Sequence, residues 1–399
     1  MKVIIAIDSL KGCLTSRQAN EAAREAVLSR WPDAEVVCVP VSDGGEGFLD
    51  AVAPLESPHN GGCTWERVTV DVLDPLMRPI RAQYLLREEH AVIEMAQASG
   101  LALLKPEERN PLRASSFGTG QLIVDALQRG AKEITVGVGG SATSDCGKGM
   151  LESMAPLLSP REGGGMPFPL SSPVKAPDIP LPIMGEDGRG LSFVLATDVA
   201  NPLLGSEGAA RTFARQKSSP DMTPAEQDAM VEELESRASA FATESATRLG
   251  HDCSCEAGAG AAGGVGYALM QYLGARRVSG IDYVLNLADF DSHLPDADII
   301  ITGEGRADRQ TLMGKVPMGI LQRTKAFAAS NLSLTSGSHK PSKPKVMLLA
   351  GQVADREALL AAGFSQVIPI TPPDMSLSEA LQPRVARHNI IETIKHITL

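Results

Sequence analysis

The stretch that decides the fold is residues 1–47, which opens MKVIIAIDSLKG and closes AEVVCVPVSDGGEG. Two short apolar runs, each followed by polar residues and glycines, flank a segment where small apolar residues recur at helical spacing. Thr15 and Gln18 form a capping-box pattern at the start of that segment. Strands joined by such a crossover helix run parallel. The sequence therefore predicts a β-α-β unit at the start of an α/β protein.

Two later segments have the composition of buried parallel strands. They read ADIIITGEG at residues 297–305 and KVMLLAG at residues 345–351, and a helical pattern covers residues 318–329 between them. Both runs are nearly all apolar and end in glycine-rich turns, as strands covered on both faces do. We expect them to belong to the same Rossmann-like sheet as the N-terminal strands.

The middle of the chain has a different pattern. Residues 65–94 alternate apolar and polar side chains, as in RVTVDV and IRAQYLL, with turn signals between the runs, which favours antiparallel hairpins. We predict a discontinuous Rossmann-like α/β domain at residues 1–64 and 282–399, an inserted mixed α/β domain at residues 65–281, and a cleft between them. Two segments rich in proline, glycine, serine or lysine predict long loops, at residues 157–190 and 330–345.

Composition narrows the function class. With 399 residues the chain can build two cores, and 38 glycines with only 4% aromatic residues suit tightly packed helix-on-sheet layers. A net charge of −11 argues against nucleic acid as a partner. The apolar run at residues 3–7 is too short for a signal peptide, and no apolar run approaches the roughly 20 residues of a membrane span, so we expect a cytoplasmic protein with no membrane partner. Six sparse cysteines are predicted to be reduced thiols, without the paired spacing of a zinc site.

Charged side chains follow the two N-terminal strands at the point where each ends. Asp8 and Lys11 follow the first, and Asp43 and Glu46 follow the second among three glycines. Open α/β sheets bind ligands at the carboxyl ends of their strands. This mixture of acids and lysine suits a phosphate ester, a metal ion and a hydroxyl proton. The alternative is a pair of ordinary turns with solvated acids.

Two further loops add candidate residues after apolar runs. The segment ITGEGRADRQTLMGKVP, residues 301–317, supplies the candidates Gly303, Glu304, Arg306, Asp308 and Lys315. The segment ATDVANPLLG, residues 196–205, supplies Asp198. Structural caps and surface ion pairs are the alternative for both segments.

Glycine-rich loops suggest where backbone N–H groups meet a ligand. VGVGGSATSDCGKGM, residues 136–150, follows a strand pattern and offers Gly139, Gly140 and Ser141 as an anion nest, with Lys148 expected to be exposed. AGAGAAGGVG contains G-x-G-x-x-G at Gly258, Gly260 and Gly263. A polar segment precedes it, so it lacks the context of an NAD site, and a glycine-rich helix start is the alternative. The three glycines are kept as candidates for cofactor binding. No Walker A or protein-kinase motif is present, so any ATP site is of another design.

These motifs together resemble the glycerate kinase family, specifically the bacterial-type class I glycerate 2-kinases. The resemblance is carried in chain order by eight motifs, namely IDSLKGCLT, VSDGGEG, IEMAQASGL, SFGTGQLI, VGGSATSDCGKGM, ATDVANPL, GAGAAGGVG and ITGEGRADRQTLMGKVPMGI. It implies ATP- and Mg²⁺-dependent phosphorylation of D-glycerate to 2-phospho-D-glycerate with release of ADP. The departures from the family pattern are Ile7, Ser144, Cys146 and Arg215, and Cys146 replaces a glycine where side-chain bulk limits backbone approach.

The resemblance and the charged loops lead to a mechanistic hypothesis. Asp43 or Asp8 accepts the proton of the substrate hydroxyl while Lys11 neutralises the phosphoryl group. Three acids, Glu46, Asp198 and Asp308, are candidate Mg²⁺ partners. Arg306 and Lys315 are candidates for the glycerate carboxylate or the phosphates. Formation of 3-phosphoglycerate, an NAD-dependent hydroxy-acid dehydrogenase and a non-catalytic sensor are the alternatives, and homo-oligomerisation is left open.

Overall fold

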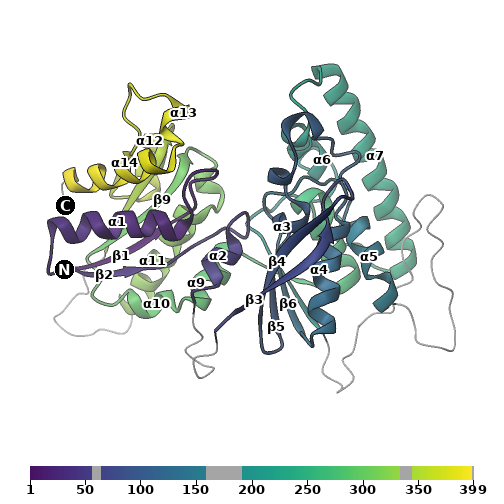
Figure 1. Ribbon diagram of the computed structural model, residues 1–399, viewed down its shortest axis with the longest axis horizontal. Coiled ribbons are helices and arrows are strands. Elements are labelled where there is room, and N and C mark those ends of the chain that lie inside the picture. Colours follow the sequence, from purple (N-terminus) through teal and green to yellow (C-terminus); the bar gives the residue numbers. More distant parts are fainter. Residues whose placement is uncertain (56–63, 159–190, 333–343, 398–399) are drawn as a thin grey trace. The chain divides into compact units, whose positions relative to one another are not determined.

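The computed structural model describes residues 1–55, 64–158, 191–332 and 344–397, and the chain divides into two compact units (Figure 1). Unit 1 comprises Met1–Asp43, Asp50–Thr64 and Gly280–Leu399. Unit 2 comprises Gly44–Leu49 and Trp65–Ser279. Both units combine helices with a β-sheet, which confirms the predicted α/β class.

Unit 1 is built on a five-stranded sheet in the order β11-β10-β9-β1-β2, and all four neighbouring pairs are parallel. The predicted β-α-β unit and the two later strands are confirmed, and they lie in this one sheet because β1 pairs with both β2 and β9. The strands are β1 (Lys2–Ile7), β2 (Glu35–Cys38), β9 (Ile299–Ala307), β10 (Lys345–Val353) and β11 (Gln366–Pro369).

Helices cover both faces of this sheet, which explains why its strands are almost wholly apolar. Alternate residues of β1 pack on opposite faces: Val3 and Ile5 meet the alanine face of α1 (Ser16–Arg30) and α14 (Pro383–His396), while Ile4 and Ala6 meet the helices of the other face. The predicted capping box begins α1, where Thr15 accepts from the Gln18 N–H and the Gln18 side chain accepts from Thr15 N–H. The other helices of unit 1 are α9 (Gly280–Leu287), α10 (Phe290–His293), α11 (Val316–Leu332), α12 (Arg356–Ala362), α13 (Leu377–Ala380) and the 3₁₀ turn η5 (Thr311–Met313), and α2 (Phe48–Val52) has residues in each unit.

Unit 2 contains a six-stranded sheet in the order β3-β4-β5-β6-β7-β8. The first three strands are antiparallel neighbours, as the alternating pattern of residues 65–94 predicts, and β5 to β8 run parallel. The strands are β3 (Glu66–Leu73), β4 (Pro79–Arg87), β5 (His90–Glu94), β6 (Glu133–Gly137), β7 (Ser192–Ala196) and β8 (Arg276–Val278). The helices are α3 (Ala96–Ser99), α4 (Phe117–Gln128), α5 (Lys148–Leu158), α6 (Ala209–Phe213), α7 (Pro224–Leu249) and α8 (Val265–Leu273), with 3₁₀ turns η1 (Leu101–Leu103), η2 (Pro106–Glu108), η3 (Arg215–Lys217) and η4 (Ala261–Gly264).

Some boundaries differ from the sequence prediction. The helix predicted at residues 318–329 begins at Val316, because a proline in the first turn needs no backbone partner, and it ends at Leu332. The first residues of the two predicted loops are helical, because α5 ends at Leu158 and α11 at Leu332. The rest of these loops, residues 159–190 and 333–343, lies outside the described residues. The prediction of an exposed Lys148 is wrong, because the side chain is half-buried with its ammonium 4.7 Å from the centre of the Phe241 ring.

Among the helices of the described residues, none combines the length and the apolar composition that a membrane crossing needs.

Candidate active site

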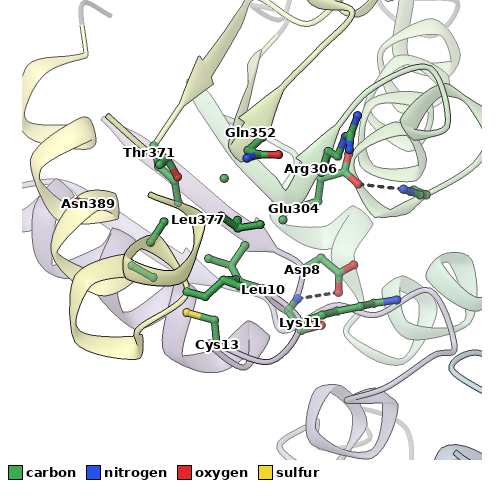
Figure 2. A pocket seen from close by; sticks show the side chains of 18 of the residues that line it. Asp8, Leu10, Lys11, Cys13, Glu304, Arg306, Gln352, Thr371, Leu377 and Asn389 are labelled. Carbon is green, nitrogen blue, oxygen red and sulfur yellow. Dashed lines mark hydrogen bonds and ion pairs between the residues drawn. The ribbon is translucent and has the colours of Figure 1, made fainter. Parts of the chain in front are cut away.

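A cavity of about 340 Å³ in unit 1 brings together charged residues from three of the predicted loops (Figure 2). It opens beyond the carboxyl ends of β1 and β2 and beside the end of β9, the place where an open parallel sheet binds its ligands. Its charged lining consists of Asp8, Lys11, Asp43, Glu304, Arg306 and Lys315. All six side chains are candidates from the sequence.

The strand ladder positions the acids at the centre of this group. The Asp8 N–H donates to the Gly303 carbonyl at 2.9 Å, so β1 and β9 stay in register up to the point where Asp8 and Glu304 enter the cavity. A Cβ atom at Gly303 would lie 2.5 Å from the Leu349 carbonyl oxygen, which explains the glycine at this position. Gly303 therefore serves the packing of the strands and is absent from the cavity lining.

Asp8 is the most strongly perturbed acid of the cavity. Burial and charge repulsion from Asp43 and Glu304 raise the pKa of Asp8 well above its usual value, although the Ser9 N–H and the Lys11 ammonium oppose this shift. The Ser9 N–H donates to Asp8 Oδ1 at 2.7 Å and orients the carboxyl group. A carboxylate with a raised pKa is a better proton acceptor than an ordinary aspartate.

Glu304 is held by two donors inside the same cavity. Its side chain is buried, Thr311 Oγ1 donates to Oε1 at 2.6 Å, and Lys315 Nζ lies 3.6 Å from Oε2. Burial raises the pKa of Glu304, while Thr311 and Lys315 counteract the shift. Thr311 was missed from the sequence, although its place three residues after Asp308, whose N–H donates to Thr311 Oγ1, is typical of a local side-chain turn.

Arg306 and Asp308, the charged residues that follow Glu304, differ in their position relative to the cavity. Arg306 is largely exposed, and its Nε lies 3.4 Å from Asp308 Oδ2. Asp308 accepts from the Gln310 N–H at 2.8 Å and is absent from the cavity lining, so the structure places this candidate magnesium ligand in a turn beside the cavity.

No group of three or more histidines, cysteines, aspartates and glutamates in the described part of the chain is arranged to hold a metal ion. Mg²⁺ does not require such a cage, because it takes one or two carboxylates and completes its shell with substrate phosphates and water. The carboxylates of Asp8 and Asp43 repel each other, and a cation bound beside them would relieve that repulsion. The two carboxylates therefore fit a magnesium ion.

The other sequence candidates lie in unit 2. Glu46 is exposed in the segment Gly44–Leu49, and the carbonyl of Gly44 accepts from the Gly139 N–H at 3.1 Å. Asp198 follows β7 and is half-buried. The unit 2 candidates are Glu46, Gly139, Gly140, Ser141, Asp198, Gly258, Gly260 and Gly263.

Several of these glycines allow the loops of unit 2 to pack backbone against backbone. A Cβ atom at Gly263 would lie 2.2 Å from the Thr143 carbonyl oxygen, and one at Gly260 would lie 2.3 Å from that of Pro202. Gly263 also has a positive φ of 66°, and its carbonyl accepts from the Cys146 N–H at 3.0 Å. Cys146 itself has a φ of 56°. This left-handed conformation favours glycine, the residue for which Cys146 is substituted in the motif VGGSATSDCGKGM.

A residue that the sequence analysis did not select holds the Ser141 loop in place. The side chain of Lys217 is 5% exposed, and its ammonium donates to Ser141 Oγ at 2.9 Å and to the Thr143 carbonyl at 2.7 Å. Burial lowers the pKa of Lys217 to about 8. Lys217 ends the basic run RTFARQK at residues 211–217, and nothing in that run distinguishes the buried amine of Lys217 from a solvated surface cation.

The parallel sheet of unit 1 thus carries, at its carboxyl edge, a cavity lined by acidic and basic side chains, which is the position where α/β proteins bind small ligands. A family model described as the Glycerate kinase family matches residues 3–399. The chain is 36% identical to "Glycerate 2-kinase" of Escherichia coli K12, over all of this chain and 97% of that protein. It is 37% identical to "Glycerate kinase" of Bacillus subtilis 168, over 96% of this chain and 93% of that one.

A crystal structure assigned to glycerate kinase 2 from Salmonella typhimurium LT2 is also similar. Its sequence identity is 32%, its TM-score is 0.69, and the match covers 99% of this chain and 96% of that chain. This chain belongs to the glycerate kinase family. It is accordingly a kinase, a phosphotransferase.

Proposed function

We propose that this protein transfers the γ-phosphoryl group of ATP to D-glycerate in the presence of Mg²⁺ and forms 2-phospho-D-glycerate and ADP. Membership of the family and the similarity to a glycerate 2-kinase support the substrate and the position of transfer. The observation in the structure that carries the proposal is Asp8, an acid with a raised pKa beside Lys11 in the unit 1 cavity. The cytoplasm remains the predicted compartment.

In the proposed reaction, Asp8 accepts the proton of the glycerate 2-hydroxyl. The hydroxyl oxygen forms a bond to the γ-phosphorus, the bond between that phosphorus and the β–γ bridging oxygen breaks, and ADP leaves with the electron pair. The charge on the transferred group is spread over its oxygens, so cations that surround it lower the barrier. Lys11, Arg306 and Lys315 supply that positive charge.

Asp43 is the carboxylate that we propose for the magnesium ion, together with phosphate oxygens and water. The ion supplies charge neutralisation and alignment of the phosphates when it is bound. Glu304 holds Lys315 in the cavity through their contact of 3.6 Å. Glu46, Asp198 and Asp308 remain predictions from the sequence as magnesium partners.

The dehydrogenase alternative has no observation in its favour. Its basis is the G-x-G-x-x-G pattern, and Gly260 and Gly263 of that pattern are accounted for by close contacts with the backbones of Pro202 and Thr143.

The experiment that tests the proposal incubates the purified protein with ATP, Mg²⁺ and D-glycerate and resolves the products by ³¹P NMR. A 2-phosphoglycerate signal that requires both glycerate and Mg²⁺ is expected. A 3-phosphoglycerate signal would keep the kinase and correct the position of transfer. Absence of any phosphoglycerate from folded protein would refute the proposed function.

The choice of Asp8 as the base is tested by the pH dependence of kcat/KM. Asp43→Asn removes a negative charge that raises the pKa of Asp8, so the acid limb of the profile should move to lower pH. Asp8→Asn should lower turnover by about 10²- to 10⁴-fold at pH values above the acid limb, where the wild-type carboxylate is ionised. If Asp43→Asn abolishes turnover while Asp8→Asn leaves it intact, the two aspartates have the opposite roles.

A further inference from the structure

The unit 1 cavity has two ends of different chemistry. Figure 2 shows Thr371 and Asn389 on the side of the cavity opposite to Lys11 and Arg306. All the cationic and acidic side chains that line the cavity lie in the loops that follow β1 and β2 and in residues 304–315. The rest of the lining is mostly apolar and comes largely from the C-terminal segment, with Leu10, Ile370, Leu377, Ala380, Leu381 and Ala386.

Two leucines of this apolar end are exposed although they line a cavity. Leu377 is 57% exposed and Leu381 is 45% exposed, and their spacing of four residues places them on one face of α13 and its C-terminal cap. Leu10 and Ile370, which are buried, complete the apolar surface from other segments. A flat apolar group placed there would cover side chains that water now contacts.

The volume of the cavity exceeds the needs of glycerate. About 340 Å³ is many times the roughly 10–15 Å³ that one water molecule needs, whereas glycerate is a three-carbon acid whose every carbon carries oxygen. Its carboxylate and hydroxyls match the charged end, and nothing in it matches the leucines. The apolar end thus suits a neutral group that is joined to phosphates.

Asn389 supplies a polar edge at this end. It lies on α14, is 6% exposed, and within the described residues its side chain makes one hydrogen bond, from Nδ2 to the thioether sulfur of Met375 at 3.4 Å. A thioether is a weak acceptor. A carboxamide presents a donor and an acceptor side by side, which is the arrangement that pairs with the amino group and ring nitrogen of adenine.

We propose that the apolar end of the unit 1 cavity binds the adenine base of the phosphoryl donor. The base lies against Leu377 and Leu381, and the Asn389 carboxamide forms hydrogen bonds with its amino group and ring nitrogen. The phosphates extend to Lys11 and Arg306. The inference rests on the proposed function in taking a nucleotide as the donor.

The test compares ADP with inosine 5′-diphosphate, which carries an oxygen in place of the adenine amino group. Isothermal titration of the wild-type protein in Mg²⁺ should show ADP binding about tenfold or more tightly than the inosine nucleotide. Asn389→Ala should weaken ADP binding and remove most of this preference. This double comparison isolates the contact between the side chain and the amino group.

A second variant tests the contact between the base and the leucines. It replaces the exposed Leu377, so it is less prone to misfolding than a variant of the buried Asn389. Leu377→Ala should weaken both nucleotides by about fivefold, because each base loses apolar contact. Leu360→Ala on α12 is the matched control, since Leu360 is 40% exposed, lies in the same unit and is absent from the cavity lining. It should bind both nucleotides as the wild type does.

Steady-state kinetics separate the two substrates. The Leu377 variant should raise KM for ATP about fivefold and leave KM for D-glycerate within about twofold of the wild type. A rise in KM for glycerate alone would overturn the base site and keep the kinase. Failure of the wild type to make phosphoglycerate would refute the proposed function, while ADP binding that depends on Leu377 and Asn389 would still support the base site. Wild-type protein that binds neither nucleotide, or a preference unchanged in both variants, would overturn the inference.

Discussion

Replacement of Lys217 by methionine should change how the stability of unit 2 depends on pH. The ammonium of Lys217 is buried, and its pKa of about 8 in the folded protein compares with an ordinary value of 10.5. At about 1.4 kcal/mol for each pH unit, this difference makes the charged side chain cost the folded state about 3 kcal/mol below pH 8. The unfolded chain binds the proton more tightly, so the cost disappears as the pH rises from about 8 to 10.5.

The free energy of unfolding of the wild type should therefore rise, relative to Lys217→Met, by about 2 kcal/mol between pH 7 and pH 9.5. The variant also leaves Ser141 and the Thr143 carbonyl without their donor, which costs about 1–3 kcal/mol at every pH, so the slope rather than the offset is the diagnostic quantity. Urea unfolding of both proteins at several pH values measures it, with the exposed Lys105→Met as a control that should keep the wild-type slope. Parallel curves for the wild type and Lys217→Met would refute the reasoning.

Three further substitutions test the loops and the cavity. Asp8→Asn should unfold at a higher urea concentration than the wild type at pH 7. Burial and Asp43 raise the pKa of Asp8 in the folded state, so the wild type loses stability as the pH rises from the unfolded pKa through the folded pKa. The difference should shrink toward pH 4, and a variant less stable than the wild type at pH 7 would contradict the raised pKa. Thr311→Val should cost about 1–3 kcal/mol in urea unfolding by removing the 2.6 Å bond to Glu304, whereas Thr311→Ser should restore most of it. Gly263→Ala should destabilise unit 2 by more than the roughly 1–2 kcal/mol that a positive φ costs a residue with a side chain, because its Cβ would lie 2.2 Å from the Thr143 oxygen. Gly205→Ala is the control, since Gly205 has a φ of 93° and no atom within 4 Å, and it should cost only the amount of the positive φ. Equal losses in thermal unfolding would argue against a steric role for Thr143.

Local sequence patterns predicted most strands of both sheets, but not β8 or β11. The apolar runs at β1, β9 and β10 indicate strands covered on both faces, and the alternation in β3 and β4 indicates antiparallel pairing. Two details were predicted less well. Helix α11 begins before the expected residue because its first turn accommodates a proline. Lys148 is half-buried against Phe241, a contact with a residue far along the chain.

The candidate site was predictable in part for a similar reason. Asp8 and Asp43 follow strands, and Glu304 lies near the carboxyl end of β9. Parallel strands bring their carboxyl ends to one edge, so this grouping could be inferred from the chain. The burial of Lys217 and the hydroxyl donated by Thr311 could not, because each depends on which segments of the folded chain surround the side chain.

The sequence by itself determined the α/β class, the parallel strands that precede the charged loops, and the family, because these properties depend on periodicity and on motifs that are local in the chain. The tertiary structure decided which side chains share the unit 1 cavity and what their electrostatic state is. It set the raised pKa of Asp8 and the lowered pKa of Lys217, and it added the apolar end around Leu377 and Asn389. The physical reason is that desolvation, charge repulsion and cavity shape depend on distances between residues far apart in the chain, which no local pattern encodes.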